Sequence, residues 1–446
     1  MSKKIGGVVV LVGICALSVF LLNCGTSPNR PEGVLYVLTE GINGIGNNVS
    51  SFGIDLDTGS LSLVNSNAST CANSSCGLPI GILLDPLGAT AFVLGQNAIS
   101  AYTVNSDGSL SSPSNPTPLA NTTCSTPPAC SFAIAMTRDA AGQFLFVLEM
   151  GSNTNCPFPV GSSNSMYAGC PSVETFAIKP GSTDLTEVPG SPFYIGRIPS
   201  ALSVVTFAGP GPSSGTTPAC GFTTTEEFLF VTSTQDLSQD HNDNALSLFC
   251  VNLSSGSLTD LTPNPPYTPP VDPISVQAVN TNPAGENTTG GVFVYVGSQP
   301  SSTGALSIFQ MCTVVGIANC TQENVTAALL MPVLTPAPPT TGQNPIAMAV
   351  DPTNTFLYVL CYGSSQVYGY RIAGSLTPLN PTNGPTGSEP VALALHPSIN
   401  NTGQFLFTSN NAADNITGFT LNTLTGSMGS PTTTISPAAP SGMAVH

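Results

Sequence analysis

The sequence predicts an all-β fold, a seven-bladed β-propeller of four-stranded blades, and three observations support this prediction. The 446 residues include 44 Gly and 41 Pro but only 7% charged residues, so turn formers abound and the charged helix formers are scarce. One strand-rich unit recurs from residue 33 to the C-terminus. Its first copy lacks a first strand, which the last residues of the chain can supply. This split unit favours a closed ring over a linear solenoid.

Each complete unit contains four segments with the pattern of β-strands. It begins with Pro and a short apolar strand, and a turn that often carries Asp-Pro leads to a strongly apolar strand such as Phe-Leu-Phe-Val. A polar loop, an alternating strand and a Gly-Ser-Leu turn into the last strand follow. Alternating β-branched and aromatic residues suit a pleated sheet, and the turn Gly supplies the required φ. Because one four-stranded sheet cannot bury both faces, the units are expected to stack around an axis.

Six copies of the unit are complete, and three of them carry long insertions. The complete copies begin at Leu78, Cys130, Ile198, Val271, Asn344 and Glu389. The seventh begins at Gly33 directly with a second strand, GVLYVLTEG. Its missing first strand matches residues 440–445, PSGMAV, which resemble the PIGIL and PVALA strands of other copies. The C-terminal strand is therefore predicted to close the first blade.

The N-terminus has the pattern of an export signal. Residues 1–4 are basic, residues 5–22 are apolar or small, and Cys24 follows. Leu21 and Cys24 resemble the lipobox of bacterial lipoproteins, in which the Cys becomes lipidated, whereas Asn23 departs from the Gly, Ala or Ser usual there. An uncleaved anchor helix is the alternative, and either would tether an exported chain to the bacterial cell envelope, in the periplasm or on the outer surface. The expected organisation is an export segment at 1–23, a tether at 24–32 and one propeller domain at 33–446.

The 13 cysteines agree with an exported chain, because most lie in close pairs within polar loops and are expected to form disulfides. The candidates are Cys71 with Cys76, Cys124 with Cys130, Cys156 with Cys170, Cys312 with Cys320, and Cys220 with Cys250. Cys361 would be left over. Zinc-type spacing with His partners is absent from the sequence. Closure of such short loops is expected to stiffen loops rather than to rescue the fold.

The repeat and the closing strand resemble the lactonase-type seven-bladed propellers, a family that includes bacterial 6-phosphogluconolactonases and related cycloisomerases. The best local matches are PIAMAVDPTNTFLYVL from Pro345 and PVALALHPSINNTGQFLFTSN from Pro390, and the resemblance covers residues 33–446. It implies lactone hydrolysis. The family typically has Pro-Arg-His at the start of a central strand, whereas this chain has Pro-Val-Ala, Pro-Ile-Ala and Pro-Ile-Gly at the matching places. The absence of Trp disfavours WD40 and quinoprotein propellers.

Lactone hydrolysis needs an activated water and a group that stabilises the oxyanion. Glu40 follows a Leu-Tyr-Val strand and resembles the acidic residue that often ends that strand in the family, where it would face the axial mouth. His396 matches a later His-Pro of the family pattern, and a turn-holding role is the alternative. Arg371 is one of the few cations outside the leader. These three are the catalytic candidates, drawn from a wider set without diagnostic spacing: Glu40, Arg138, Glu149, Arg197, His241, Arg371 and His396.

Charge limits the partners. The formal net charge is −16 with only seven Lys and Arg, too few for a phosphate-binding stripe, so nucleic acid and anionic lipid headgroups are excluded. A phosphorylated lactone would also need cationic contacts, so a small neutral lactone is the expected substrate. The membrane is expected to be reached only through the N-terminal anchor, and the protein is expected to be a monomer.

Two alternatives remain open at this point. Asp236, Asp240 and Asp243 lie close together in DLSQDHNDN and can offer oxygen ligands to Ca²⁺, although the spacing fits no EF-hand and a solvated acidic loop is the simpler interpretation. No other cofactor is predicted. Low charge, long Ser/Thr/Asn/Pro loops and disulfides also suit a non-catalytic propeller that binds an envelope protein or glycan.

Overall fold

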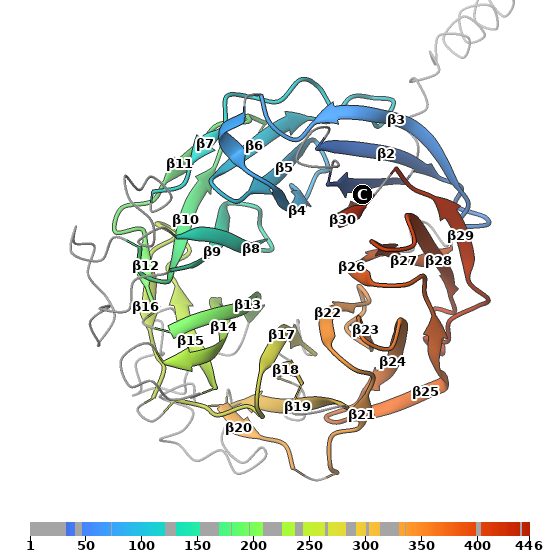
Figure 1. The fold of residues 1–446 in the computed structure, drawn as a ribbon. Coiled ribbons are helices and arrows are strands. Elements are labelled where there is room, and N and C mark those ends of the chain that lie inside the picture. The colour runs from blue at the N-terminus through green and yellow to red at the C-terminus, as the bar shows by residue number, and fades with distance from the viewer. Residues whose placement is uncertain are drawn as a thin grey trace, which may run out of the picture.

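The structure is a computed structural model, and its described residues form seven antiparallel sheets set in a ring (Figure 1). The described residues are 33–40, 47–72, 74–120, 131–151, 169–179, 181–195, 197–207, 225–236, 244–263, 266–281, 291–299, 303–312, 330–334, 336–397, 403–437 and 439–446. Within these ranges the helical structure is a single 3-10 turn, Ser74–Cys76, and no helix is long and apolar enough to cross a membrane. The predicted seven-bladed β-propeller is confirmed.

The first four blades follow the chain, and their strands are given from the axis outward. Blade 1 contains β30 (Pro440–Val445), β1 (Val34–Thr39), β2 (Asn48–Ile54) and β3 (Leu61–Ser69). Blade 2 contains β4 (Pro79–Leu84), β5 (Thr90–Gly95), β6 (Ala98–Thr103) and β7 (Thr117–Pro118). Blade 3 contains β8 (Phe132–Arg138), β9 (Phe144–Met150), β10 (Ser172–Ile178) and β11 (Leu185–Glu187), with β12 (Phe193–Tyr194) paired to β10. Blade 4 contains β13 (Arg197–Phe207), β14 (Glu226–Asp236), β15 (Ala245–Val251) and β16 (Leu258–Asp260).

The last three blades complete the ring. Blade 5 contains β17 (Pro273–Asn280), β18 (Val292–Ser298), β19 (Gly304–Met311) and β20 (Leu330–Pro332), with β21 (Thr340–Thr341) paired to β19. Blade 6 contains β22 (Pro345–Val350), β23 (Phe356–Cys361), β24 (Gln366–Ile372) and β25 (Leu376–Pro385). Blade 7 contains β26 (Pro390–His396), β27 (Gln404–Asn410), β28 (Asn415–Leu421) and β29 (Thr432–Ile435).

The C-terminal strand closes the ring, as the split repeat predicts. β30 pairs antiparallel with β1, with Val37 opposite Met443. Beyond the end of that strand, the amides of Val34 and His446 each donate to the other's carbonyl, at 3.1 and 3.0 Å. β30 also contacts the inner strands β4 and β26 of the two neighbouring blades. The first and last parts of the chain therefore share one blade.

Hydrophobic cores lie between consecutive blades, and there are seven such clusters among the described residues, one for each interface. The second strand of each blade is buried on both faces, which explains why it reads as a continuous apolar run. In β23, for example, all six residues of FLYVLC are buried. Burial of one large apolar side chain contributes about 1.5–3 kcal/mol, so these strands dominate the stability of the ring.

The Gly-Ser-Leu turns set the spacing between blades. Gly426 in blade 7 has a φ of 72°, and a Cβ there would overlap the ring of Phe356 in blade 6. Gly256 in blade 4 stands in the same relation to Phe144 in blade 3. The Tyr358 hydroxyl donates to the carbonyl of Gly426 at 2.7 Å, so the contact is both packed and hydrogen-bonded. The glycine is required both for its backbone conformation and for the space that its missing side chain leaves.

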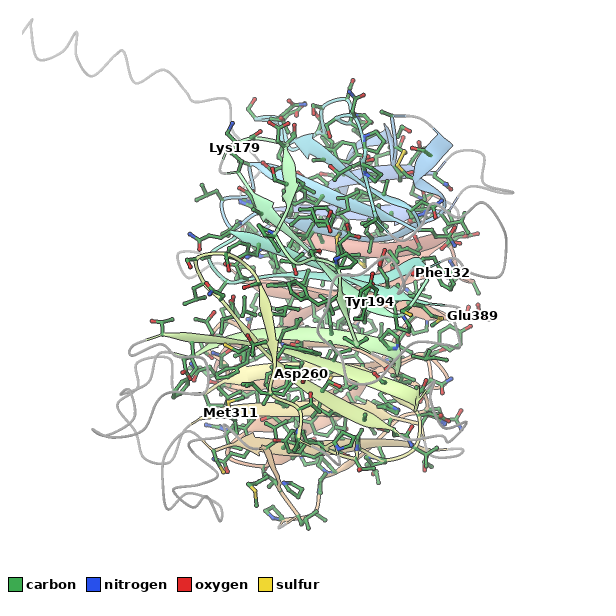
Figure 2. The ribbon with its side chains drawn as sticks, turned by 90° about the vertical axis from the view of Figure 1, so that its left-hand side faces the viewer. Phe132, Lys179, Tyr194, Asp260, Met311 and Glu389 are labelled. Atoms are coloured by element: carbon green, nitrogen blue, oxygen red, sulfur yellow. A yellow bond between two sulfur atoms is a disulfide. The ribbon has the colours of Figure 1, made fainter. Side chains whose placement is uncertain are left out.

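The inner strands all run in one direction, which gives the ring two distinct faces. Figure 2 shows the ring from its side. Phe132 and Glu389 lie where two inner strands begin, and both are on the right-hand face in this view. Lys179, which follows the third strand of blade 3, lies toward the other. We call these the start face and the end face, after the ends of the inner strands.

Candidate functional site

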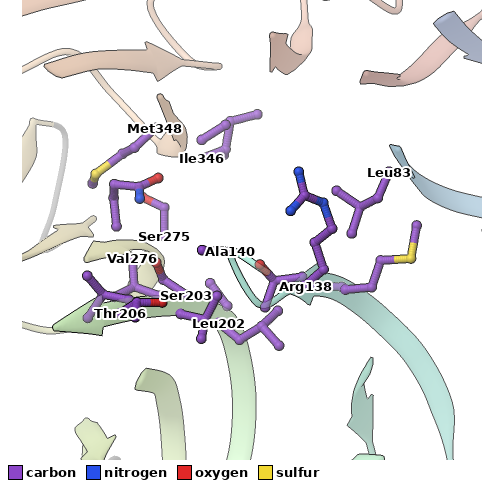
Figure 3. A pocket seen from close by; sticks show the side chains of 18 residues that line it. Leu83, Arg138, Ala140, Leu202, Ser203, Thr206, Ser275, Val276, Ile346 and Met348 are labelled. Carbon is purple, nitrogen blue, oxygen red and sulfur yellow. The ribbon is translucent and has the colours of Figure 1, made fainter. Parts of the chain in front are cut away.

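A cavity of about 500 Å³ lies along the axis, against the inner strands β4, β8, β13, β17 and β22 (Figure 3). Most of its lining is aliphatic or small, including Leu83, Leu202, Ile346 and Met348. The polar contributors are Thr137, Arg138, Ser203, Thr206, Ser275 and Gln277. The cavity is large enough for a small organic ligand and offers it few charged contacts.

Arg138 is the one charged side chain among the residues that line this cavity. It ends β8, and its side chain projects into the axial space (Figure 3). Its Nε donates to the carbonyl of Leu84 at 2.7 Å, and its Nη1 donates to the carbonyl of Asp139 at 3.0 Å. Burial lowers the pKa of Arg138, while the charges of Asp139 and Asp85 raise it, and an arginine stays protonated in proteins. Two backbone carbonyls thus hold a cation in place, and within the described part of the chain Nη2 has no protein partner.

Glu227 lies behind the cavity wall in the next blade. It is only 1% exposed, and the hydroxyl of Thr206, which lines the cavity, donates to its Oε1 at 3.0 Å. Oε2 has no hydrogen-bond partner among the described residues. Burial, followed by the nearby charge of Asp139, raises the pKa of Glu227 to about 7, while the Thr206 hydroxyl and the amide of Ala140 act in the opposite direction. A carboxyl that titrates near neutrality therefore adjoins the cavity.

Asp139, next to Arg138 in the chain, has a role in the turn between β8 and β9. Its Oδ1 accepts a hydrogen bond from the amide of Phe144 at 2.7 Å. Asp85 and Asp351 occupy the same turn position in blades 2 and 6 and also accept amides from the following strand. Burial raises the pKa of Asp139, partly offset by turn amides and by Arg138. Asp139 thus fixes the turn and adds negative charge between Arg138 and Glu227.

Two of the predicted catalytic residues lie at opposite faces of the ring. Glu40 follows β1, and its amide donates to the carbonyl of Ala439, just before β30 begins, which places it at the start face. His396 ends β26 at the end face and is fully buried, with its ring 6.2 Å from that of Phe405 and its atoms close to Gly33. The length of β1, at about 3.3 Å per residue, separates Glu40 from His396 by roughly 20 Å.

The third, Arg371, lies on β24, the third strand from the axis in blade 6, and its side chain is exposed. The three predicted residues therefore belong to three different blades and are not brought together. None of them lines the axial cavity.

The cysteines of the described residues are nearly all in disulfides. Cys71 and Cys76, one of the expected pairs, are joined. Cys170, Cys250 and Cys312 are also disulfide-bonded, and their pairing stays a prediction. Cys361 is a buried free thiol, the expected left-over cysteine. The remaining cysteine calls lie outside the described residues: Cys24, Cys124, Cys130, Cys156, Cys220 and Cys320.

The acidic loop proposed for Ca²⁺ lies mostly beyond what the structure describes. Asp240 and Asp243 are outside the described residues, and Asp236 ends β14 without a described side chain. Among the side chains that are described, no group of three or more His, Cys, Asp or Glu is placed to hold a metal ion.

The sequence did carry a signal for Arg138. In the copies PIGILLD and PIAMAVD an aliphatic residue precedes the turn Asp, whereas FAIAMTRD has Arg138 there. A cation in place of an inner-strand aliphatic residue therefore marks the axial site. Glu227 offered no such signal, because it reaches the cavity only through its pairing with Thr206 on the adjacent strand.

Comparisons with known proteins support the fold. No family model matches the chain, and no curated protein matches it. A "putative 6-phosphogluconolactonase" from Bacteroides fragilis is 14% identical, with a TM-score of 0.56 over 94% of this chain and 99% of that chain. A protein of the same description from Bacteroides uniformis is 12% identical, with a TM-score of 0.57 over 94% and 100% of the two chains. A protein from Lactobacillus plantarum is 13% identical, with a TM-score of 0.59 over 93% and 99%. At such identities the likeness shows a shared propeller fold, and function must be argued from the site.

Proposed function

We propose that this chain is an exported, lactonase-like propeller that binds a small neutral lactone in the axial cavity and hydrolyses it. The observation that carries the proposal is a single fixed cation, Arg138, at the wall of a largely apolar cavity of about 500 Å³. The basic and then apolar N-terminus supports export. The share of the chain recovered in the envelope fraction of lysed cells would test that part.

The charge of the cavity favours an uncharged substrate. A phosphate group is recognised by several cations or by many converging amides, whereas the described cavity lining offers one guanidinium. The buried carboxyls of Asp139 and Glu227 lie close behind the cavity lining, and their negative charge would repel the phosphate of a phosphorylated lactone. A lactone carbonyl needs only one or two donors, and the aliphatic lining suits its ring.

Arg138 would act on the carbonyl oxygen of such a lactone. When water attacks the carbonyl carbon, negative charge develops on that oxygen, and a donor that is already fixed in place stabilises it without reorganisation. Nε and Nη1 each donate to a backbone carbonyl, so the hydrogens of Nη2 and the second hydrogen of Nη1 are available for this role. Ser203 lines the same cavity, and its hydroxyl accepts from the amide of Ala278 at 2.9 Å, so its proton would be available to the ring oxygen.

The test is a hydrolysis screen of the purified full chain in detergent with δ-valerolactone, γ-butyrolactone and glucono-δ-lactone, and with 6-phosphogluconolactone as the charged comparison. Arg138→Met should lower kcat/KM on the neutral lactones by about 10²–10³-fold, the effect of losing one oxyanion donor. Arg371→Met, which removes an exposed cation from β24, is the matched control and should leave kcat/KM unchanged. An Arg138→Met variant as active as the parent chain would refute the proposed site.

A non-catalytic binding propeller is the second candidate, and the aliphatic character of the cavity lining favours it. On this view the chain would bind a lactone or another small neutral ligand without turnover. Calorimetric titration of the folded chain with the same neutral lactones separates the two cases. A saturable heat of binding in the parent chain that is absent in Arg138→Met, with no hydroxy acid formed, would favour the non-catalytic binding propeller.

A further inference from the structure

We propose that Glu227 is the proton acceptor of this site and that it acts on the cavity through the hydroxyl of Thr206. The inference rests on the proposed lactone hydrolysis and deepens it, since it names the general base. It also places the reacting groups near the end face of the ring. The start face, where Glu40 lies, is the opposite end.

The two side chains are placed by the sheet itself. Thr206 and Glu227 are paired across β13 and β14, and directly paired residues of antiparallel strands project from the same side of the sheet. The Thr206 Oγ1 lies 3.0 Å from the Glu227 Oε1, and Thr206 also lines the cavity. Thr206 therefore joins the carboxyl, through its hydroxyl, to the residues that line the cavity.

A structural explanation for this carboxyl is weak. Glu227 is 1% exposed, yet its Oε2 has no hydrogen-bond partner among the described residues. A buried carboxyl that leaves an oxygen unsatisfied destabilises the fold, and a neutral or apolar side chain at this position would avoid that cost. Groups of this kind gather at functional sites, where a perturbed acid is useful.

The surroundings of Glu227 set its titration. In the described part of the chain, the charged groups nearby are Asp139 in the β8–β9 turn, Arg138 at the end of β8 and Glu226 on its own strand. Of the neighbouring strands, β15 contains no charged residue, while β13 and β9 carry Arg197 and Glu149 at their start-face ends. Burial and the charge of Asp139 raise the pKa of Glu227 to about 7, so both its forms exist near neutral pH. A general base works best when its pKa lies near the operating pH.

The proposed step balances without any further reactant. A water oxygen forms a bond to the lactone carbonyl carbon, and the π-electron pair of the C=O bond moves onto the oxygen that faces Arg138. The proton lost by the water passes to the Thr206 Oγ1, whose own proton passes to the Glu227 carboxylate. The tetrahedral intermediate then collapses, the bond between that carbon and the ring oxygen breaks, and the relay returns the proton to the leaving alkoxide. The product is the open hydroxy acid.

The experiment measures kcat/KM of the full chain on δ-valerolactone as a function of pH, for the parent chain and for Glu227→Gln, Thr206→Ser and Thr206→Val. The parent kcat/KM should rise with pH through about 7 and then level, because the carboxylate form is the active one. Glu227→Gln should lose that rise. At pH values above about 7 its kcat/KM should be about 10²–10⁴-fold lower than that of the parent chain, the usual contribution of a general base. Thr206→Ser should keep the rise, because it keeps the hydroxyl. Thr206→Val should resemble Glu227→Gln. The double variant with both Thr206→Val and Glu227→Gln should have a kcat/KM no lower than that of either single variant.

The outcomes separate this inference from the function on which it rests. If the folded parent chain hydrolyses no neutral lactone, both are overturned. If it hydrolyses δ-valerolactone and Glu227→Gln keeps the same pH profile, the relay is wrong while lactone hydrolysis stands. Thermal melting of each variant checks that a loss of rate is not a loss of fold.

Discussion

At the scale of single residues, an unusual feature of this sparsely charged chain is that it buries carboxyl groups in blades 3 and 4. Glu149 and Glu174, on the neighbouring strands β9 and β10, are both fully buried. The Ser172 hydroxyl donates to Glu149 Oε2 at 2.7 Å, and the amide of Ala120 donates to both oxygens of Glu174 at 3.2 and 3.1 Å. Burial, followed by the charge of Glu149, raises the pKa of Glu174 to about 9. The Glu174 carboxyl is therefore protonated at neutral pH.

This protonation makes stability depend on pH. A carboxyl that titrates near 4.5 when unfolded and near 9 when folded gives full stability below pH 4.5, and stability then falls as the pH rises until about 9 is passed. Glu174→Gln supplies a permanently neutral side chain, so it should flatten this fall and raise the free energy of unfolding at pH 8 by up to about 5 kcal/mol. Denaturant unfolding at several pH values measures the effect. Asp57→Asn, an exposed position in the turn between β2 and β3, is the control, and parallel pH curves for the two variants would contradict the assignment.

At the scale of single elements, the turn between the third and fourth strands can be tested with two glycines that differ in one respect. Gly426 and Gly374 have φ values of 72° and 74°. A Cβ on Gly426 would overlap Phe356, whereas no heavy atom lies within 4 Å of a Cβ built on Gly374. Gly374→Ala should cost about 1 kcal/mol for its backbone conformation alone. Gly426→Ala should cost about 2–4 kcal/mol, because overpacking is added. Equal losses in denaturant unfolding would show that the turn does not set the blade spacing.

The same scale shows what the sequence could predict and what it could not. The second strands were evident because burial on both faces makes them continuous apolar runs, as in FLYVLC of β23. The short strands β12 and β21, of two residues each, had no detectable pattern, because they only extend the edges of blades 3 and 5. The site was less predictable still. Arg138 stood out only against the repeat, and Glu227 reaches the cavity through a residue on the adjacent strand of the same blade.

At the scale of the whole molecule, closure and asymmetry are separate properties of the ring. The seven inter-blade cores are alike in kind, so the repeat explains closure. The cavity is not symmetric, since its lining comes from β4, β8, β13, β17 and β22 and not from β26 or β30. The polar lining residues lie on blades 3, 4 and 5, the three copies that carry long insertions. Function is thus expected to reside where the repeat is least regular.

Closure itself gives the last prediction. Removal of residues 440–446 takes β30 from blade 1, exposes the edge of β1, and strips Met443 and Ala444 from the cores that blade 1 shares with blades 7 and 2. Loss of one buried Met side chain alone costs about 2–5 kcal/mol, so the truncated chain should melt at least about 2–6 °C lower and less cooperatively. A synthetic peptide of residues 436–446, added in excess, should restore the melting temperature by pairing with β1, whereas a scrambled peptide should not. A truncated chain that melts like the full chain would mean that the ring is held without its closing strand.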